Sequence, residues 1–97
     1  MSEAFVTVVG THFRGSEAKQ AVNALVVGET DFQFEREPDN EYDANAIQVI
    51  HAGEFIGYLA RANNHNLAAA LDEGAEFTAR MIDWEGRKPV LQISWDG

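Results

Sequence analysis

The stretch REPDNEYDANAIQVI, residues 36–50, joins a run of turn-forming residues to a run of strand-forming ones. Its first part is rich in Pro, Asn and Asp, which predicts a polar loop over residues 38–45. Residues 46–50 then predict a strand, because β-branched side chains dominate them. The tripeptide at residues 51–53 signals a tight hairpin, and residues 54–59 are expected to return as the paired strand.

Segments farther from this hairpin predict four more strands. Residues 5–9 are β-branched and aromatic, and residues 30–37 alternate Phe with polar side chains, the pattern of a half-buried strand. Two final strands are expected at residues 77–83 and 89–95, on either side of a turn at residues 84–88.

One helix is predicted, over residues 62–73. Asn63 or Asn64 suits the N-cap position of this helix, and Gly74 suits its C-terminal end. Residues 12–15 are expected to form a strand that runs into a turn. Residues 16–25 leave open a loop or one or two helical turns.

About six short strands, with one helix after the fourth or fifth strand, indicate a mostly β fold over a single domain of residues 1–97. Strands this numerous in so short a chain usually close into a small barrel, which removes exposed sheet edges. We therefore expect a six-stranded OB/SH3-like barrel. The residues expected in the core alone are Ile47, Val49, Ile56, Leu59, Leu67 and Leu71.

The composition excludes several classes of protein. With 97 residues, 45% of them hydrophobic, the chain can build one core, and without Cys it has no disulfide, thiolate nucleophile or cysteine zinc site. No apolar run spans a membrane, and the start of the chain lacks the features of a secretory signal, which predicts a cytoplasmic protein. The net charge of −9 argues against non-specific attraction to phosphate backbones or anionic lipid.

Catalytic patterns are missing from the sequence. No serine lies in a nucleophile elbow, and the three histidines are scattered singly, without the spacing of a metal site. No glycine-rich phosphate loop is present either. We therefore expect a chain that is not an enzyme and that uses no metal and no cofactor.

Seven carboxylates and a single basic residue, Arg36, lie between Glu29 and Asp43. Within this acidic stretch, three carboxylates alternate from residue 39 to residue 43, as they do in calcium loops. A calcium loop would need glycine at its sixth position and glutamate at its twelfth, where this chain has Ala44 and Ile50. The pattern favours a solvated acidic loop.

Residues 36–49, followed after a short hairpin by Ile56-Gly57-Tyr58-Leu59 and Arg61, resemble the HIRAN domain. That family is a small β-barrel module found at the N-terminus of some fork-remodelling DNA translocases, and free-standing in bacteria and their viruses. A first strand that ends in Val8-Val9-Gly10 and a Leu-rich helix after Arg61 agree with it. The resemblance covers nearly the whole chain and implies a non-catalytic module that recognises the 3′-hydroxyl end of single-stranded DNA.

The resemblance also implies roles for individual residues. Asp43 matches the aspartate that accepts a hydrogen bond from the terminal 3′-hydroxyl, and a carboxylate would repel a terminal phosphate. Tyr42 and Phe13 match aromatic positions that pack against the terminal bases, whereas Tyr58 and Arg61 match positions near the backbone phosphates.

Asn40 would hydrogen-bond the end nucleotide or its own loop. His12 stands where DNA-binding eukaryotic members carry an arginine, so this chain lacks one permanent cation there. The residues predicted to bind DNA are His12, Phe13, Asn40, Tyr42, Asp43, Tyr58 and Arg61.

Structural roles remain open for several of these residues. Asn40 and Asp43 could cap amides of their own loop, Tyr42 could close the end of the barrel, and Phe13 could lie in the core. Arg36 is expected to pair with neighbouring acids rather than with DNA, and Gly57 to permit a close approach of two strands.

A second functional hypothesis is an acidic protein-interaction domain that keeps the barrel and binds no nucleic acid. Its charge suits docking on a basic protein surface. Under either hypothesis, a separate helicase, nuclease or other protein is a possible partner.

Overall fold

The computed structural model describes residues 1–96, apart from the side chain of Asn63. Within that part, the chain forms six strands, two α-helices and one 3-10 turn. In chain order they are β1 (Ser2–Val9), η1 (Thr11–Phe13), α1 (Ser16–Asn23), β2 (Phe32–Arg36), β3 (Ile47–His51), β4 (Glu54–Leu59), α2 (Arg61–Asp72), β5 (Thr78–Glu85) and β6 (Lys88–Trp95).

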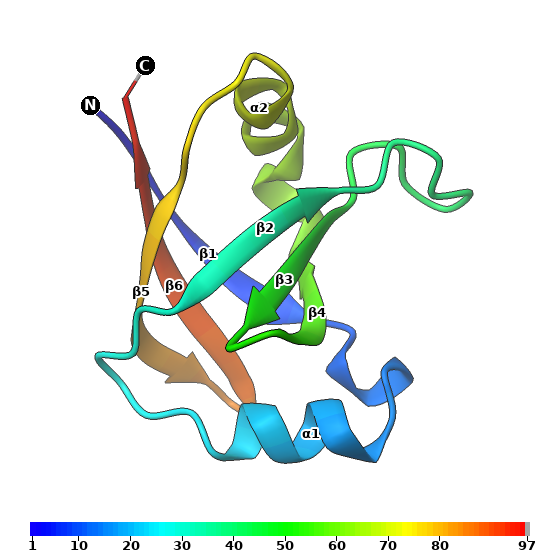
Figure 1. Cartoon of the computed structure of the whole chain (residues 1–97), viewed down its shortest axis with the longest axis vertical. Helices are drawn as coiled ribbons and strands as arrows, with labels where there is room; N and C mark the ends of the chain where they lie inside the picture. The colour runs from blue at the N-terminus through cyan, green and yellow to red at the C-terminus, as the bar shows by residue number, and fades with distance from the viewer. Residues whose placement is uncertain (97) are drawn as a thin grey trace.

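The six strands form one antiparallel sheet in the order β2-β3-β4-β1-β6-β5. The first six residues of β1 pair with β6, and its last two, Val8 and Val9, pair with β4. Because β1 pairs with β6 along its first part and with β4 at its end, the sheet bends at β1. Strands β2, β3 and β4 therefore cross the direction of β1, β5 and β6 (Figure 1).

The prediction of a mostly β, six-stranded fold is confirmed. The sheet is an open half-barrel rather than a closed barrel, since no ladder joins β2 to β5 within residues 1–96. Met81 of β5 instead exchanges backbone hydrogen bonds of 2.7 and 2.8 Å with Gly28 and Glu29, in the segment before β2. Assignment to the OB or the SH3 type stays a prediction.

The core lies inside the bend of the sheet and is covered at opposite ends by α1 and α2 (Figure 1). Five of the six residues expected there are at most 1% exposed, and Leu71 packs half-buried at the margin. Burial of an Ile or Leu side chain contributes about 1.5–3 kcal/mol to stability, so this cluster is the main source of the fold's stability.

The prediction of a single helix is wrong, because residues 16–23 form a second one, α1. Its eight residues make about two turns, one of the alternatives left open for this segment, and it buries only Ala18 and Val22, too few apolar residues to give a clear helical period. Residues 11–13 form a 3-10 turn, whereas the sequence predicts a strand from residue 12. No helix within residues 1–96 combines the length and the hydropathy needed to cross a membrane.

The predicted cap of α2 is also wrong for Asn64. The helix begins one residue early, at Arg61, with Ala60 as its N-cap, and Asn64 lies inside its first turn, 4% exposed. The side chain of Asn63 lies outside the part of the chain that the structure describes.

Gly57 is a point of close approach between β4 and the end of β1. A Cβ atom at this position would lie 2.6 Å from the carbonyl oxygen of Val9 and 3.0 Å from the side chain of Val8, and the φ angle is +155°. Only glycine tolerates both conditions. Gly57 therefore fixes the point at which the chain leaves β1 and enters η1.

Candidate functional site

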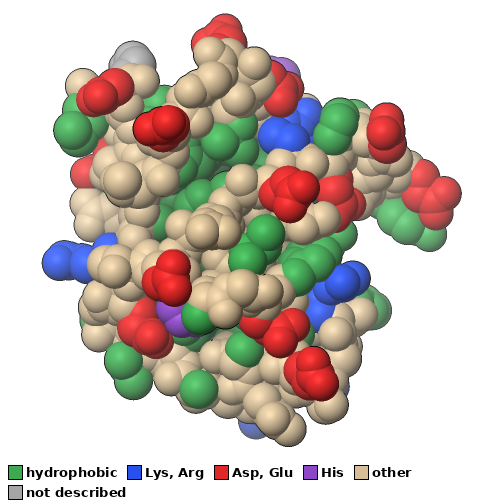
Figure 2. All heavy atoms as spheres, in the orientation of Figure 1, with side chains coloured by type: hydrophobic (Ala, Val, Ile, Leu, Met, Phe, Trp, Pro, Cys, Tyr) green, Lys and Arg blue, Asp and Glu red, His purple; other side chains and the backbone are tan. Residues whose placement is uncertain are grey.

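The β2–β3 loop (residues 37–46) projects from the body of the molecule and carries acidic and hydrophobic side chains (Figures 1 and 2). Arg36 holds its base. The guanidinium donates to the carbonyls of Ala46 and Ala44 at 2.8 and 3.0 Å, and to the carboxylate of Asp72 on α2 at 3.0 and 3.3 Å. Its acidic partner is therefore a residue of α2, and the loop is tied to that helix.

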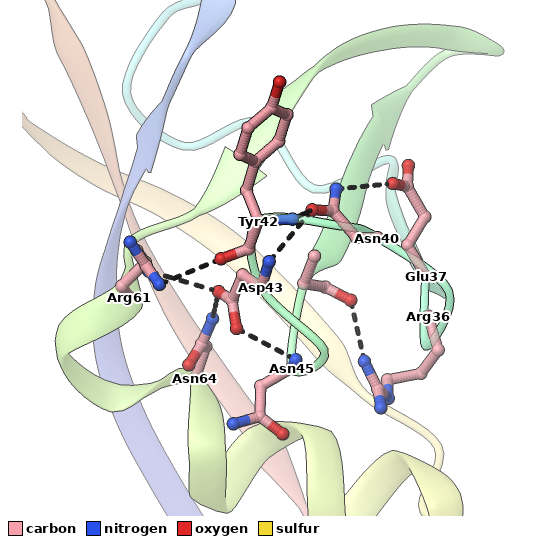
Figure 3. A network of polar contacts seen from close by, with 9 residues as sticks. Arg36, Glu37, Asn40, Tyr42, Asp43, Asn45, Arg61 and Asn64 are labelled. Carbon is pink, nitrogen blue, oxygen red and sulfur yellow. Dashed lines mark hydrogen bonds and ion pairs between the residues drawn. The ribbon is translucent and has the colours of Figure 1, made fainter.

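Asn40 organises the turn within the loop (Figure 3). Its side-chain oxygen accepts the backbone N–H groups of Tyr42 and Asp43 at 2.9 and 3.0 Å, and its amide donates to Glu37 at 2.9 Å. These three bonds use both acceptor sites and one of the two amide hydrogens of Asn40, so the side chain caps amides of its own loop.

Asp43 connects the loop to α2. Its Oδ1 accepts the Asn45 N–H at 2.9 Å, and its Oδ2 accepts the Asn64 amide at 2.7 Å. The Nε of Arg61 lies 3.5 Å from the same Oδ2, while another nitrogen of Arg61 donates to the Tyr42 carbonyl at 3.1 Å. Figure 3 shows the carboxylate at the centre of this network.

The Asp43 carboxyl has a lowered pKa. Burial acts to raise that pKa, but the hydrogen bonds from Asn45 and Asn64, together with the charges of Arg61 and Arg36, outweigh it. The group is therefore ionised at neutral pH. A carboxylate accepts about four hydrogen bonds, so Asp43 keeps capacity for a further donor.

Glu37 and Tyr58 form a second polar pair beside the loop. The Tyr58 hydroxyl donates to Glu37 at 2.9 Å, and the Gln48 amide donates to the same carboxylate. Burial and the neighbouring Glu37 raise the pKa of Tyr58. For Glu37, burial raises the pKa, and hydrogen bonds from Asn40, Gln48 and Tyr58 lower it further than burial raises it. A phosphate contact through the Tyr58 hydroxyl would have to break its bond to Glu37.

Two aromatic side chains stand out from the surface. Phe13 and Tyr42 are 80% and 81% exposed, so Phe13 is not a core residue and Tyr42 does not close the barrel. In Figure 3 the Tyr42 ring points away from the polar network below it. Nearby, the Arg14 guanidinium lies over the Phe55 ring at 3.9 Å.

Phe13, Tyr42 and Arg14 border one cavity of about 680 Å³, which we call the end cavity. It lies between η1, the β2–β3 loop, the end of β4 and the start of α2. Of the predicted residues, the structure brings together Phe13, Asn40, Tyr42, Asp43, Tyr58 and Arg61 around it. His12 lies outside it and lines a neighbouring cavity, with its ring packed on Phe13 at 3.9 Å between centroids.

Sequence reasoning gives no site role to Glu37, which belongs to the quoted stretch, or to Asn64. Arg14 is one of the few basic residues that the sequence offers in place of the missing cation at position 12, and the structure places it at the end cavity. Asn64 is a buried polar residue at helical spacing from Leu67 and Leu71. Its position on the apolar face of α2 is the sequence signal that could have identified it as part of the site. Within residues 1–96, no three His, Asp or Glu side chains gather as a metal site would require.

Comparisons with known proteins bear on the family and the fold. The family model described as HIRAN domain matches residues 1–94. No curated protein sequence matches significantly. A crystal structure of a protein from Lactobacillus plantarum is similar, at 27% identity over 95% of both chains, with a TM-score of 0.80. The HIRAN domain of human HLTF shares the fold, at 22% identity over 97% of this chain and 74% of that one, with a TM-score of 0.75.

Proposed function

This chain belongs to the HIRAN domain family, and we propose that it recognises the 3′-hydroxyl end of single-stranded DNA. HIRAN is known as a DNA-binding domain and not as a catalytic one. The finer proposal concerns which part of DNA is bound and by which residues.

The observation that carries the proposal is the placing of two exposed aromatic rings beside an ionised carboxylate in one cavity. Phe13 and Tyr42 expose about four fifths of their side chains and are not needed by the core. A base stacked on such a ring gains about 1–3 kcal/mol, whatever its sequence. The cavity therefore suits unpaired bases.

Asp43 supplies the preference for the end of the strand. Its carboxylate is held by Asn45, Asn64 and Arg61, so it is oriented before any ligand arrives. A 3′-hydroxyl can donate to the free acceptor capacity of this group, whereas a 3′-phosphate would bring two negative charges together in a half-buried place. The loop-capping role and the ligand role of Asp43 are compatible, because they use different lone pairs.

Two cations can neutralise the negative charge of the phosphate next to the 3′ end of the strand. Arg14 and Arg61 both line the end cavity, and the Arg61 side chain is 74% exposed. Arginine donates in a forked geometry that matches phosphate. Because the chain as a whole has a net charge of −9, attraction is confined to such local regions, and long duplex DNA is a poor ligand.

The test compares two short 5′-labelled single strands that differ only at the 3′ end, by fluorescence anisotropy at low salt. We expect the 3′-hydroxyl strand to bind about tenfold more tightly than the 3′-phosphate strand, because a hydrogen bond to a charged group contributes about 1.5–3 kcal/mol. Asp43→Ala should remove the difference. Asp39→Ala, an exposed carboxylate of the same loop, is the control. Equal binding of both strands by the unmodified protein contradicts the proposal.

A second candidate function is docking on a basic protein surface without nucleic acid. It is favoured by the carboxylates scattered over the face in Figure 2. Absence of binding to either strand at low salt, together with salt-sensitive binding to a basic protein, would favour this function instead.

A further inference from the structure

A second cavity, of about 650 Å³, adjoins the end cavity. Val9, Gly10 and Phe13 line both, so the chain from the end of β1 to η1 forms their common wall. On its other sides the second cavity is bordered by α1 and by the turn between β5 and β6. In Figure 1 these two elements lie together at the end of the molecule opposite α2.

This second cavity is lined by Lys19 of α1, Arg87 of the β5–β6 turn and Lys88 at the start of β6, and by no carboxylate of the described residues. Within residues 1–96, none of these three cations makes a side-chain hydrogen bond or ion pair. The charges are therefore not used to stabilise the fold.

The distribution of positive charge over the whole chain is uneven. The chain has seven Lys and Arg residues. Two of them, Arg14 and Arg61, line the end cavity, and three line the second, so five of the seven border two adjoining cavities. In a protein of net charge −9, this places nearly all the attraction for an anion on either side of Phe13.

The floor of the second cavity is apolar. Val8, Val9 and Val22 form it, and the exposed Phe13 ring stands at its border with the end cavity. Cations around an apolar floor match a nucleotide, whose base and sugar carry apolar surface and whose phosphate is anionic.

We propose that the second cavity binds the nucleotides that precede the 3′-terminal one, with the strand passing over Phe13. This inference rests on the proposed function, because an end held at Asp43 fixes where the rest of the strand must leave. Lys19, Arg87 and Lys88 then neutralise the upstream phosphates. A strand of about four nucleotides would fill both cavities, at the short end of the site sizes of single OB-type domains.

The experiment measures affinity for oligothymidylates of two and six nucleotides, both with a free 3′-hydroxyl, across a salt series. The unmodified protein should bind the hexamer about tenfold more tightly than the dimer at about 50 mM salt. Arg87→Glu should abolish most of this gain and leave dimer binding within about twofold. It should also flatten the hexamer's salt dependence, by about 0.7 in log–log slope for each phosphate that the variant no longer neutralises.

Arg80→Glu is the matched control, since it makes the same change of charge on β5, outside both cavities. If the dimer binds through Asp43 but the hexamer gains nothing, or if both variants weaken the hexamer equally, the second cavity is not part of the site and the proposed function stands. If neither oligonucleotide binds, both proposals are overturned.

Discussion

Asp43 joins its own loop to α2 and is the carboxylate of the acidic stretch that lines the end cavity. Its two oxygens are bonded to Asn45 in its own loop and to Asn64 in α2, and Arg61 of the same helix lies beside them. The polar contacts that shape the loop thus orient the one carboxylate placed at the end cavity. A residue can serve structure and recognition together when its hydrogen-bonding capacity exceeds what the fold uses.

The hydrogen bonds and charges around Asp43 predict how the free energy of unfolding depends on pH. Asp43 has a lower pKa in the folded chain than when unfolded, so it adds stability above its unfolded pKa of about 4, and that contribution disappears as the pH falls through the folded value. Asp43→Asn should therefore lose less unfolding free energy between pH 7 and pH 3 than the unmodified protein does. Urea titrations at both values measure this difference.

Asp39→Asn serves as the control, because Asp39 is exposed and makes no side-chain hydrogen bond within residues 1–96. An equal pH dependence for the unmodified protein and Asp43→Asn would show that the contacts of Asp43 with Asn64 and Arg61 do not stabilise the ionised form.

For single residues, the sequence predicts site residues where they belong to a motif. It does not predict a side-chain contact between residues that lie far apart in the chain. The resemblance that residues 36–49 and the motif after them carry led to six side chains that the fold places around one cavity. Whether they bind DNA stays a prediction. Asn64 resembled a helix cap because local spacing cannot reveal a partner 21 positions away, the separation between Asp43 and Asn64.

Among the secondary-structure elements, the crossing of β4 and β1 has a strict steric requirement, because it needs glycine at position 57. Gly57→Ala would place a Cβ atom 2.6 Å from the carbonyl oxygen of Val9, a backbone atom that cannot move aside without shifting the strand. We expect a loss of more than about 2 kcal/mol in unfolding free energy, from strained φ and a steric clash together. Because the crossing also sets the entry to η1, Phe13 should move away from the end cavity.

Gly53→Ala is the control for this prediction. Gly53 also has a positive φ, of 84°, but a Cβ atom there would meet nothing within 4 Å. The expected loss of unfolding free energy in Gly53→Ala is therefore about 1 kcal/mol, from backbone strain alone. Urea unfolding of the two variants measures the difference, and equal losses would show that the close approach at Gly57 is unimportant.

Strands were easier to predict than helices in this chain. The alternation in β2 and the β-branched residues of β1 and β3 mark half-buried strands, and all six strands lie where they were expected to within a few residues. The helix α1 carries only two buried residues, so its stability comes from packing on the end of the sheet, which no local pattern records. The open edge between β2 and β5 likewise depends on tertiary packing.

For the whole molecule, the distribution of charge matters more than its sum. The chain is strongly acidic, yet five of its seven Lys and Arg residues border two cavities on either side of one exposed aromatic ring. An acidic surface elsewhere disfavours duplex DNA and long strands, so binding is expected to depend on a few local contacts. The net charge thus restricts the ligand to a short segment and does not exclude nucleic acid.

Binding of the 3′-hydroxyl end in the end cavity can be followed residue by residue in an NMR titration of the ¹⁵N-labelled protein with a short single strand. We expect amide shifts to concentrate at Phe13, Tyr42 and Asn45, whose N–H is bonded to Asp43, and a 3′-phosphate strand to leave Asn45 largely unmoved. Shifts confined to another face of the molecule, or an identical response of Asn45 to both strands, would contradict this expectation.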